Sequence, residues 1–285
     1  MYMKTKNLFK YVMFVAAVSI IFTACRKKEK EDEIDSDTAG ASDNALAEGT
    51  FNDASNIADQ AAGGSLSSYL GAYNNGSGER GLLSTCASIT RDTVSVPHTF
   101  TVDFGSTNCL CGDGRYRRGQ IVVSYSGHYR DSASMHSITF VNYFVNNNQV
   151  TGTHSVTNMG HNSNHNLYFN ISINASVIKA NNGGTITYTS TRVREWVAGE
   201  STIVWNDDVY SITGNASGSH SNGHSYTATI TSALKVHLNC HWIESGVLEL
   251  VPSGKPTRTI DFGTDGNCDH DATVTINGHV YNITM

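Results

Sequence analysis

From about residue 82 to the end of the chain, apolar and polar side chains alternate with a period of two. The segment 167–177 shows this most clearly, since Leu, Phe, Ile, Ile, Ala and Val alternate there with Tyr, Asn, Ser, Asn and Ser. Such alternation is typical of a strand with one buried and one solvent-exposed face. The pattern therefore predicts β-strands for most of the chain, and only 3 prolines interrupt it.

Short turn sequences separate the alternating segments. They occur at Asn181–Gly184, Asn222–Gly223, Ser253–Pro256 and Asn277–Gly278. Because short turns join antiparallel neighbours, we predict an all-β fold over 82–285. We expect an antiparallel meander of about ten to thirteen strands, arranged as a sandwich or as a barrel-like sheet.

A single short helix is predicted before the strands, over 42–62. Ser42 or Asp43 can cap its N-terminus, and Gly63 and Gly64 can end it. Between these limits, apolar residues recur at helical spacing, namely Ala47, Phe51, Ala54, Ala58 and Ala61. The helix and a loop that follows it make up a segment 42–81 that we expect to precede the β domain.

The N-terminus indicates export. Three lysines precede the apolar run Tyr11–Phe22, which is too short to cross a bilayer and has the length of a signal-peptide core. The sequence from Phe22 to Cys25 resembles the lipobox of bacterial lipoproteins. That resemblance implies that residues 1–24 are removed and that Cys25 carries acyl chains such as palmitate. The alternative is an ordinary secretory signal with a chance cysteine.

Residues 25–41 are predicted to form a charged tether. Ten of the twelve residues in Arg26–Asp37 are charged, so this run favours a solvated chain. Lys30, Glu31 and Asp32 resemble the export signal of surface lipoproteins in Bacteroidota, which implies an outer-membrane lipoprotein displayed on the cell surface. The alternative is a plain spacer and a domain that faces the periplasm. The net charge of −6 does not suggest a nucleic-acid partner.

Two stretches of the chain repeat each other. Thr99–Cys109 and Thr257–Cys268 share the core Asp-Phe-Gly and a closing cysteine, and each follows an earlier cysteine, Cys86 or Cys240. We expect two similar strand–turn–strand corners that bring their cysteines together. The predicted disulfides are Cys86–Cys109 and Cys240–Cys268, with Cys111 left over; Cys86–Cys111 is the alternative.

These motifs carry a wider resemblance. Thr259–Gly263 with Cys268, Gly112–Arg115 with Arg118–Ile121, and Lys255–Thr259 resemble a group of uncharacterised outer-membrane or surface lipoproteins of Bacteroidota. The resemblance spans essentially the whole mature chain. Its motifs look structural, and it implies no activity.

Residues with metal-binding or catalytic chemistry form no familiar motif. The twelve histidines include close pairs without a His-Glu-x-x-His motif, so we interpret them as surface residues. We read Asp207–Asp208 as an acidic turn and the loop with Arg115, Arg117 and Arg118 as solvated. Asp265, Asp269 and Asp271 lack calcium-loop spacing. We therefore expect no catalytic residue, metal or cofactor.

Three short sequences resemble the Asp-(Ser/Thr)-aliphatic O-glycosylation motif of Bacteroidota. Their hydroxyl residues are Thr38, Thr93 and Ser132, and Thr38 is favoured because we expect the tether to be exposed.

The expected function is a non-catalytic binding or structural module, anchored in the membrane by its lipid. The alternatives are a glycan-binding accessory protein of a polysaccharide-uptake system or, less favoured, a hydrolase. The expected partners are the membrane and either a glycan or an envelope protein.

Overall fold

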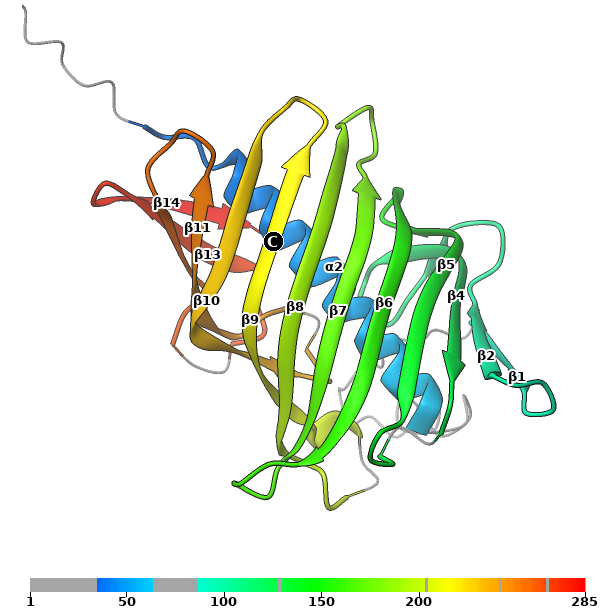
Figure 1. Cartoon of the computed structure of the whole chain (residues 1–285). Helices are drawn as coiled ribbons and strands as arrows, with labels where there is room; N and C mark the ends of the chain where they lie inside the picture. The colour runs from blue at the N-terminus through cyan, green and yellow to red at the C-terminus, as the bar shows by residue number, and fades with distance from the viewer. Residues whose placement is uncertain are drawn as a thin grey trace, which may run out of the picture. The chain divides into compact units, whose positions relative to one another are not determined.

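The alternating segments form one antiparallel sheet that curves around a helix (Figure 1). The structure is a computed structural model that describes residues 35–63, 87–127, 130–202, 205–240, 242–264 and 267–284. Its helix is α2 (Ala39–Gly63), and a short 3₁₀ turn η2 spans Trp205–Asp207. The strands are β1 (Ser88–Asp92), β2 (His98–Asp103), β3 (Cys109–Leu110), β4 (Tyr116–Tyr125), β5 (Met135–Val145), β6 (Asn148–His161), β7 (Leu167–Ile178), β8 (Thr185–Ala198), β9 (Val209–His220), β10 (Ser225–His237), β11 (Ser245–Pro252), β12 (Arg258–Asp261), β13 (Asp271–Ile276) and β14 (His279–Thr284).

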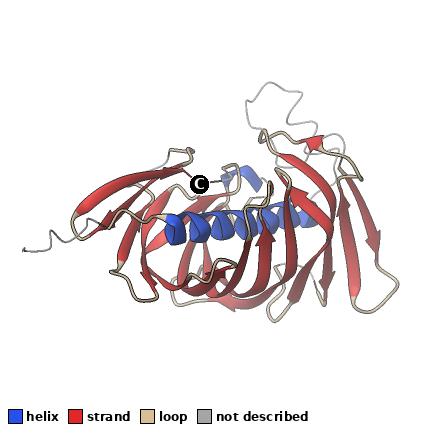
Figure 2. Cartoon of the chain, turned by 90° about the horizontal axis from the view of Figure 1, so that it is seen from above, coloured by secondary structure: helices blue, strands red, loops and turns tan. Residues whose placement is uncertain are grey.

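The predicted antiparallel meander is confirmed. Strands pair in chain order from β1 to β14, except that the two-residue strand β3 pairs only with β4. In the described part of the chain, β1 and β14 do not pair, so the sheet stays open. Of the two expected arrangements, the sandwich is not formed: the strands make a single curved sheet, open at its edges, with a helix in its hollow (Figure 2).

The helix is longer than expected and belongs to the core. It begins at Ala39, where the carboxylate of Asp37 accepts the Ala39 N–H at 2.9 Å and caps the first turn. Ser36–Met285 forms one compact unit, which contains both the helix and the sheet. No helix in the described part of the chain is long and apolar enough to cross a membrane.

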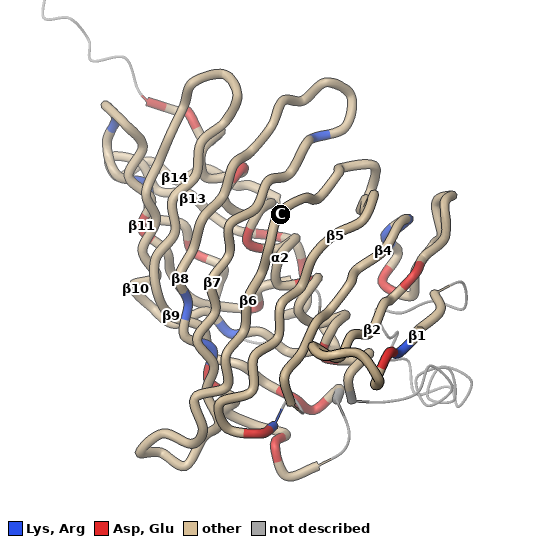
Figure 3. Tube along the Cα trace, turned by 45° about the vertical axis from the view of Figure 1, so that its right-hand side comes forward, with Lys and Arg blue, Asp and Glu red and all other residues tan. Residues whose placement is uncertain are grey.

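The two faces of the sheet differ in chemistry. The inner face packs apolar side chains such as Phe169, Ile186 and Leu248 around α2. The outer face carries exposed hydroxyl and amide groups, and five neighbouring strands place them at one level: Thr153, Asn174, Thr189, Ser217 and Thr227. This outer layer accounts for the low content of charged residues, 15%, and Figure 3 shows how few charges the central strands carry.

Candidate functional site: the buried helix and the two corners

Acidic side chains of α2 pair with basic side chains of the sheet. Glu48 accepts hydrogen bonds from Arg192, at 2.6 Å, and from the hydroxyl of Tyr188. Asp59 lies 2.9 Å from Arg194. Both arginines come from β8, so this strand holds the helix at two points about three turns apart.

A third acid of the helix binds a different wall of the sheet. Asp53 lies 2.8 Å from Arg117 of β4, and Arg117 also lies 2.6 Å from Asp113. Five or six residues along a helix turn the side-chain direction by more than 100°, so Asp53 faces away from Glu48 and Asp59. The helix is therefore clamped between β4 and β8.

Burial and charge act against each other in this cluster. Burial alone would lower the pKa of the Arg117 guanidinium, but the charges of Asp53 and Asp113 raise it well above its ordinary value. Burial would raise the pKa of Asp113, but hydrogen bonds from Arg117 lower it overall. At Asp59 burial outweighs Arg194, and the pKa is raised. Replacing both partners of such a buried ion pair by apolar side chains is often neutral for stability, whereas removing one partner leaves an uncompensated buried charge.

Arg117 corrects our interpretation of the arginine loop. We expected the three arginines to be solvated, yet Arg117 is 0% exposed. Arg115 lies with its guanidinium over the ring of Trp242, 4.7 Å from the centroid, and Arg118 lies over Phe144 at 3.7 Å. Arg115 and Arg118 therefore pack on aromatic rings, and Arg117 pairs with Asp53 of the helix.

The two repeated stretches form two corners with the same hydrogen bonds. We call 99–109 the first corner and 257–268 the second corner. In each, the aspartate accepts the N–H of the glycine two residues later, at 2.7 Å from Asp103 to Gly105 and 2.8 Å from Asp261 to Gly263. Phe104 and Phe262 are both buried. The predicted similarity of the two stretches is therefore structural.

Each corner also uses a glycine on the adjacent strand. The N–H of Phe104 donates to the carbonyl of Gly119, and the N–H of Phe262 donates to that of Gly246, both at 3.0 Å. Each of these glycines opposes two residues of the next strand inward, Asn142–Tyr143 or Ala233–Leu234, which is a β-bulge. The strand that carries the glycine is β4, which follows the first corner in the chain, and β11, which precedes the second. The two copies therefore share the corner itself but not the order of the strands around it.

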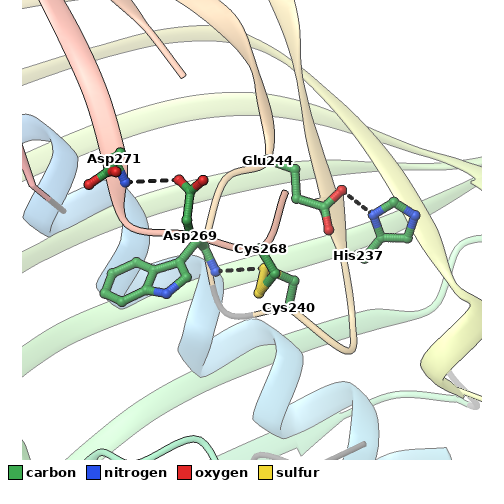
Figure 4. Close-up of a disulfide and its surroundings, with 7 residues drawn as sticks. His237, Cys240, Glu244, Cys268, Asp269 and Asp271 are labelled. Carbon is green, nitrogen blue, oxygen red and sulfur yellow. Dashed lines mark hydrogen bonds and ion pairs between the residues drawn. A yellow bond between two sulfur atoms is a disulfide. The ribbon is translucent and has the colours of Figure 1, made fainter. Parts of the chain in front are cut away.

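One predicted disulfide lies at the second corner. Cys240 and Cys268 are bridged, with their Cα atoms 5.6 Å apart (Figure 4). Cys109 is disulfide-bonded as well, but its predicted partner Cys86 lies outside the described residues. Cys111 remains a buried thiol that donates to the carbonyl of Cys109 at 3.7 Å.

A polar cavity of about 830 Å³ lies beside the second corner. We call it the corner cavity. Its walls are residues 261–264 and Asn267 of the second corner, Asp269, the start of β13, the end of β14, Ser42 of α2 and Thr38 just before the helix. The carboxylates of Asp261, Asp269 and Asp271 line it. The sequence pattern draws attention to Asp269 and Asp271 but does not predict the cavity, because its walls come from segments more than 200 residues apart.

Two other buried ionisable groups have shifted pKa values. Asp208 is 5% exposed, and burial together with the charges of Asp207 and Asp59 raises its pKa to about 7. Burial lowers the pKa of His154 to about 4, and its Nε2 lies 3.2 Å from the hydroxyl of Ser55 on the helix. Both groups lie against the helix side of the sheet, without an opening to substrate among the described cavities. Asp207, by contrast, is exposed.

The remaining predicted sites are scattered. Thr93 and Ser132 are exposed in loops, whereas Thr38 is partly buried, and its carbonyl accepts the N–H of Ser42. Thr38 is therefore less accessible than we expected. Hydrogen bonds from the loop that contains Thr93 lower the pKa of Asp92 to about 2. Cys25 and the charged run as far as residue 34 lie outside the described residues, whereas Asp37 at the end of that run caps α2.

Histidines and carboxylates do not gather into a metal site in the part of the chain that the structure describes. The closest His–carboxylate contact joins His237 to Glu244 near the disulfide (Figure 4). It is a single pair, and a catalytic zinc needs three protein ligands.

Comparison with known proteins identifies no relative. No family model matches the chain, and neither the curated proteins nor the solved structures include a significantly similar one.

Proposed function

We propose that this protein is a lipid-anchored binding module of the cell envelope, held in the outer membrane through Cys25 and displayed on the cell surface, with no catalytic role. The lipobox-like sequence and the Lys-Glu-Asp run support the anchor and the display. Lipid on one cysteine attaches a domain stably when more than one acyl chain is present.

The observation that supports the binding role is that the ionisable side chains fall into two groups, one that is buried against α2 and one that lines the corner cavity. Those of the inner face hold α2 in place, as Arg117, Arg192 and Arg194 do. The carboxylates of the corner cavity, by contrast, are partly exposed and open to solvent. A concave site of this size, in which polar groups converge over an apolar floor, is suited to holding a ligand.

A hydrolase is less well supported by the same contacts. Glycoside hydrolysis needs two carboxyl groups set across a cleft, one of them with a raised pKa. Two carboxyl groups have a raised pKa, Asp59 and Asp208, and neither lines the corner cavity. Burial is the main cause of the rise at both, and neighbouring carboxylates add to it at Asp208.

Fractionation and protease treatment of intact cells test the anchor and the display. The wild-type protein is expected in the outer-membrane fraction and should be lost when protease is added outside the cells. Cys25→Ser should leave the signal uncleaved or release the domain. Retention of the Cys25→Ser protein in the membrane after normal processing would refute the lipid anchor, and full protection of the wild type would favour the periplasmic orientation.

A further inference from the structure

We propose that the corner cavity binds a neutral saccharide through its carboxylate and amide side chains. This deepens the proposed binding role and rests on it. The cavity volume of about 830 Å³ is within the range of small-molecule sites, roughly 300–1,000 Å³, and suits a ligand of a few sugar units.

The carboxylates of the cavity keep acceptor capacity. Asp261 uses Oδ1 for the N–H of Gly263, and Asp269 uses Oδ1 for the N–H of Asp271. Asp271 places Oδ1 3.2 Å from His270. For these three side chains the described residues provide a partner to one oxygen only. The second oxygen of each can accept a hydrogen bond from a ligand hydroxyl, and such charge-assisted bonds are strong.

Amide groups complement the carboxylates. Asn267 and Asn282 also line the cavity and are exposed, and each amide both donates and accepts. A sugar presents adjacent hydroxyls that do the same. Phe262, Ala272 and Ile283 supply an apolar floor against which the C–H face of a ring can lie.

The charge of the cavity selects against acidic ligands. Three carboxylates line it, and its described lining contains no lysine or arginine. An anionic sugar would therefore lie next to uncompensated negative charge. Repulsion between like charges at short range would lower its binding affinity. The lining therefore favours neutral sugars over uronic acids.

Saturation-transfer NMR and calorimetry on the full-length protein in detergent would test this. The probes are neutral trisaccharides of glucose, mannose, galactose and N-acetylglucosamine, with trigalacturonic acid as the acidic probe. We expect at least one neutral trisaccharide to bind and the acidic one to bind at least tenfold more weakly. Equal or tighter binding of trigalacturonic acid would overturn the charge argument.

Three variants locate the site. Asp271→Asn should weaken neutral-sugar binding about tenfold, and Asn282→Trp should abolish it by filling the cavity from an exposed position on edge strand β14. Glu249→Gln, an exposed carboxylate on β11 away from the cavity, is the matched control and should bind like the wild type. Wild-type affinity in Asn282→Trp would refute the site.

A negative result remains interpretable. Each variant is checked by its thermal unfolding midpoint, so a loss of binding is not confused with unfolding. If no neutral trisaccharide binds, the saccharide proposal fails, whereas the anchor and surface display are decided separately by the fractionation of the Cys25→Ser protein.

Discussion

The first and second corners have the same backbone construction but different neighbours. Each joins a buried phenylalanine to a glycine at a β-bulge, and each stands near one end of the sheet. Near the first corner, Arg117, Asp113 and Asp53 form an ion cluster. Beside the second corner lies the corner cavity, next to the start of α2.

The repeated residues and the helix beside them contribute differently to the two ends of the sheet. The repeated sequence determines the corner, because the same residues make the same hydrogen bonds twice. The surroundings of the helix then differ along its length: Asp53 pairs with Arg117 near the first corner, whereas Ser42 at the start of the helix and the preceding Thr38 line the corner cavity beside the second. The first corner thus packs against a buried ion cluster, and the second borders an open cavity.

Removal of the buried arginine near the first corner should have the largest effect. Arg117→Met leaves Asp53 and Asp113 without their main partner, and breaking a buried pair costs about 3–5 kcal/mol. Chemical denaturation of the purified protein would measure the free energy of unfolding.

The second corner offers a matched arginine. Arg258 is 1% exposed, and its described hydrogen bonds include those to the carbonyl oxygens of Pro256 and Asp37. Arg258→Met removes these bonds to neutral acceptors and should cost about 1–3 kcal/mol. A loss as large as that of Arg117→Met would contradict the claim that the ion cluster makes the first corner depend more strongly on its arginine.

Loss of the disulfide should destabilise the second corner next. The Cys240–Cys268 bridge closes a separation of 28 residues, and the chain-entropy model gives it about 3.5 kcal/mol. Cys240→Ser combined with Cys268→Ser should lower the free energy of unfolding by about 2–4 kcal/mol in denaturant titrations. An effect below about 0.5 kcal/mol would mean that the bridge adds nothing to a corner already held by its hydrogen bonds.

Much of this fold was predictable because strand alternation is a local property. The segment 167–177 alternates in the sequence and forms β7 with alternating burial. The corners were predictable for the same reason, since residues close in sequence build them. The described part of the second corner carries the predicted disulfide.

The buried helix was not predictable in the same way. Polar residues such as Asn44, Asp53 and Gln60 usually mark a solvent-facing surface, yet all three are buried. One signal was present: Arg192 and Arg194 lie on the same face of the strand as the apolar Ile186 and Trp196, so their side chains had to point inward. Buried arginines need acidic partners, but only the folded chain shows that α2 supplies them.

The glycines at the bulges should give a smaller and graded effect. A Cβ on Gly119 would lie 1.9 Å from the carbonyl oxygen of Asn142, and one on Gly246 would lie 2.6 Å from that of Ala233. Both glycines have positive φ, 81° and 117°. Alanine at either position should cost about 1–3 kcal/mol in thermal or chemical unfolding, with the larger loss at Gly119. A neutral Gly119→Ala would show that the bulge relaxes freely.

Replacing the aspartates of the two corners should change the free energy of unfolding least, and it compares the two corners most directly. Asp103 pairs across the strands with Gln120, whose amide donates to its Oδ2 at 2.8 Å, whereas Asp261 pairs with the apolar Val247. Asp261→Ala therefore removes one bond, to Gly263, and should cost about 1 kcal/mol. Asp103→Ala removes two and should cost about 2 kcal/mol. In a Gln120→Val background, which gives the first corner the residue type of the second, the two costs should become equal. A difference that persists in that background would show that the corners differ in their backbone, and not only in the side chains around them.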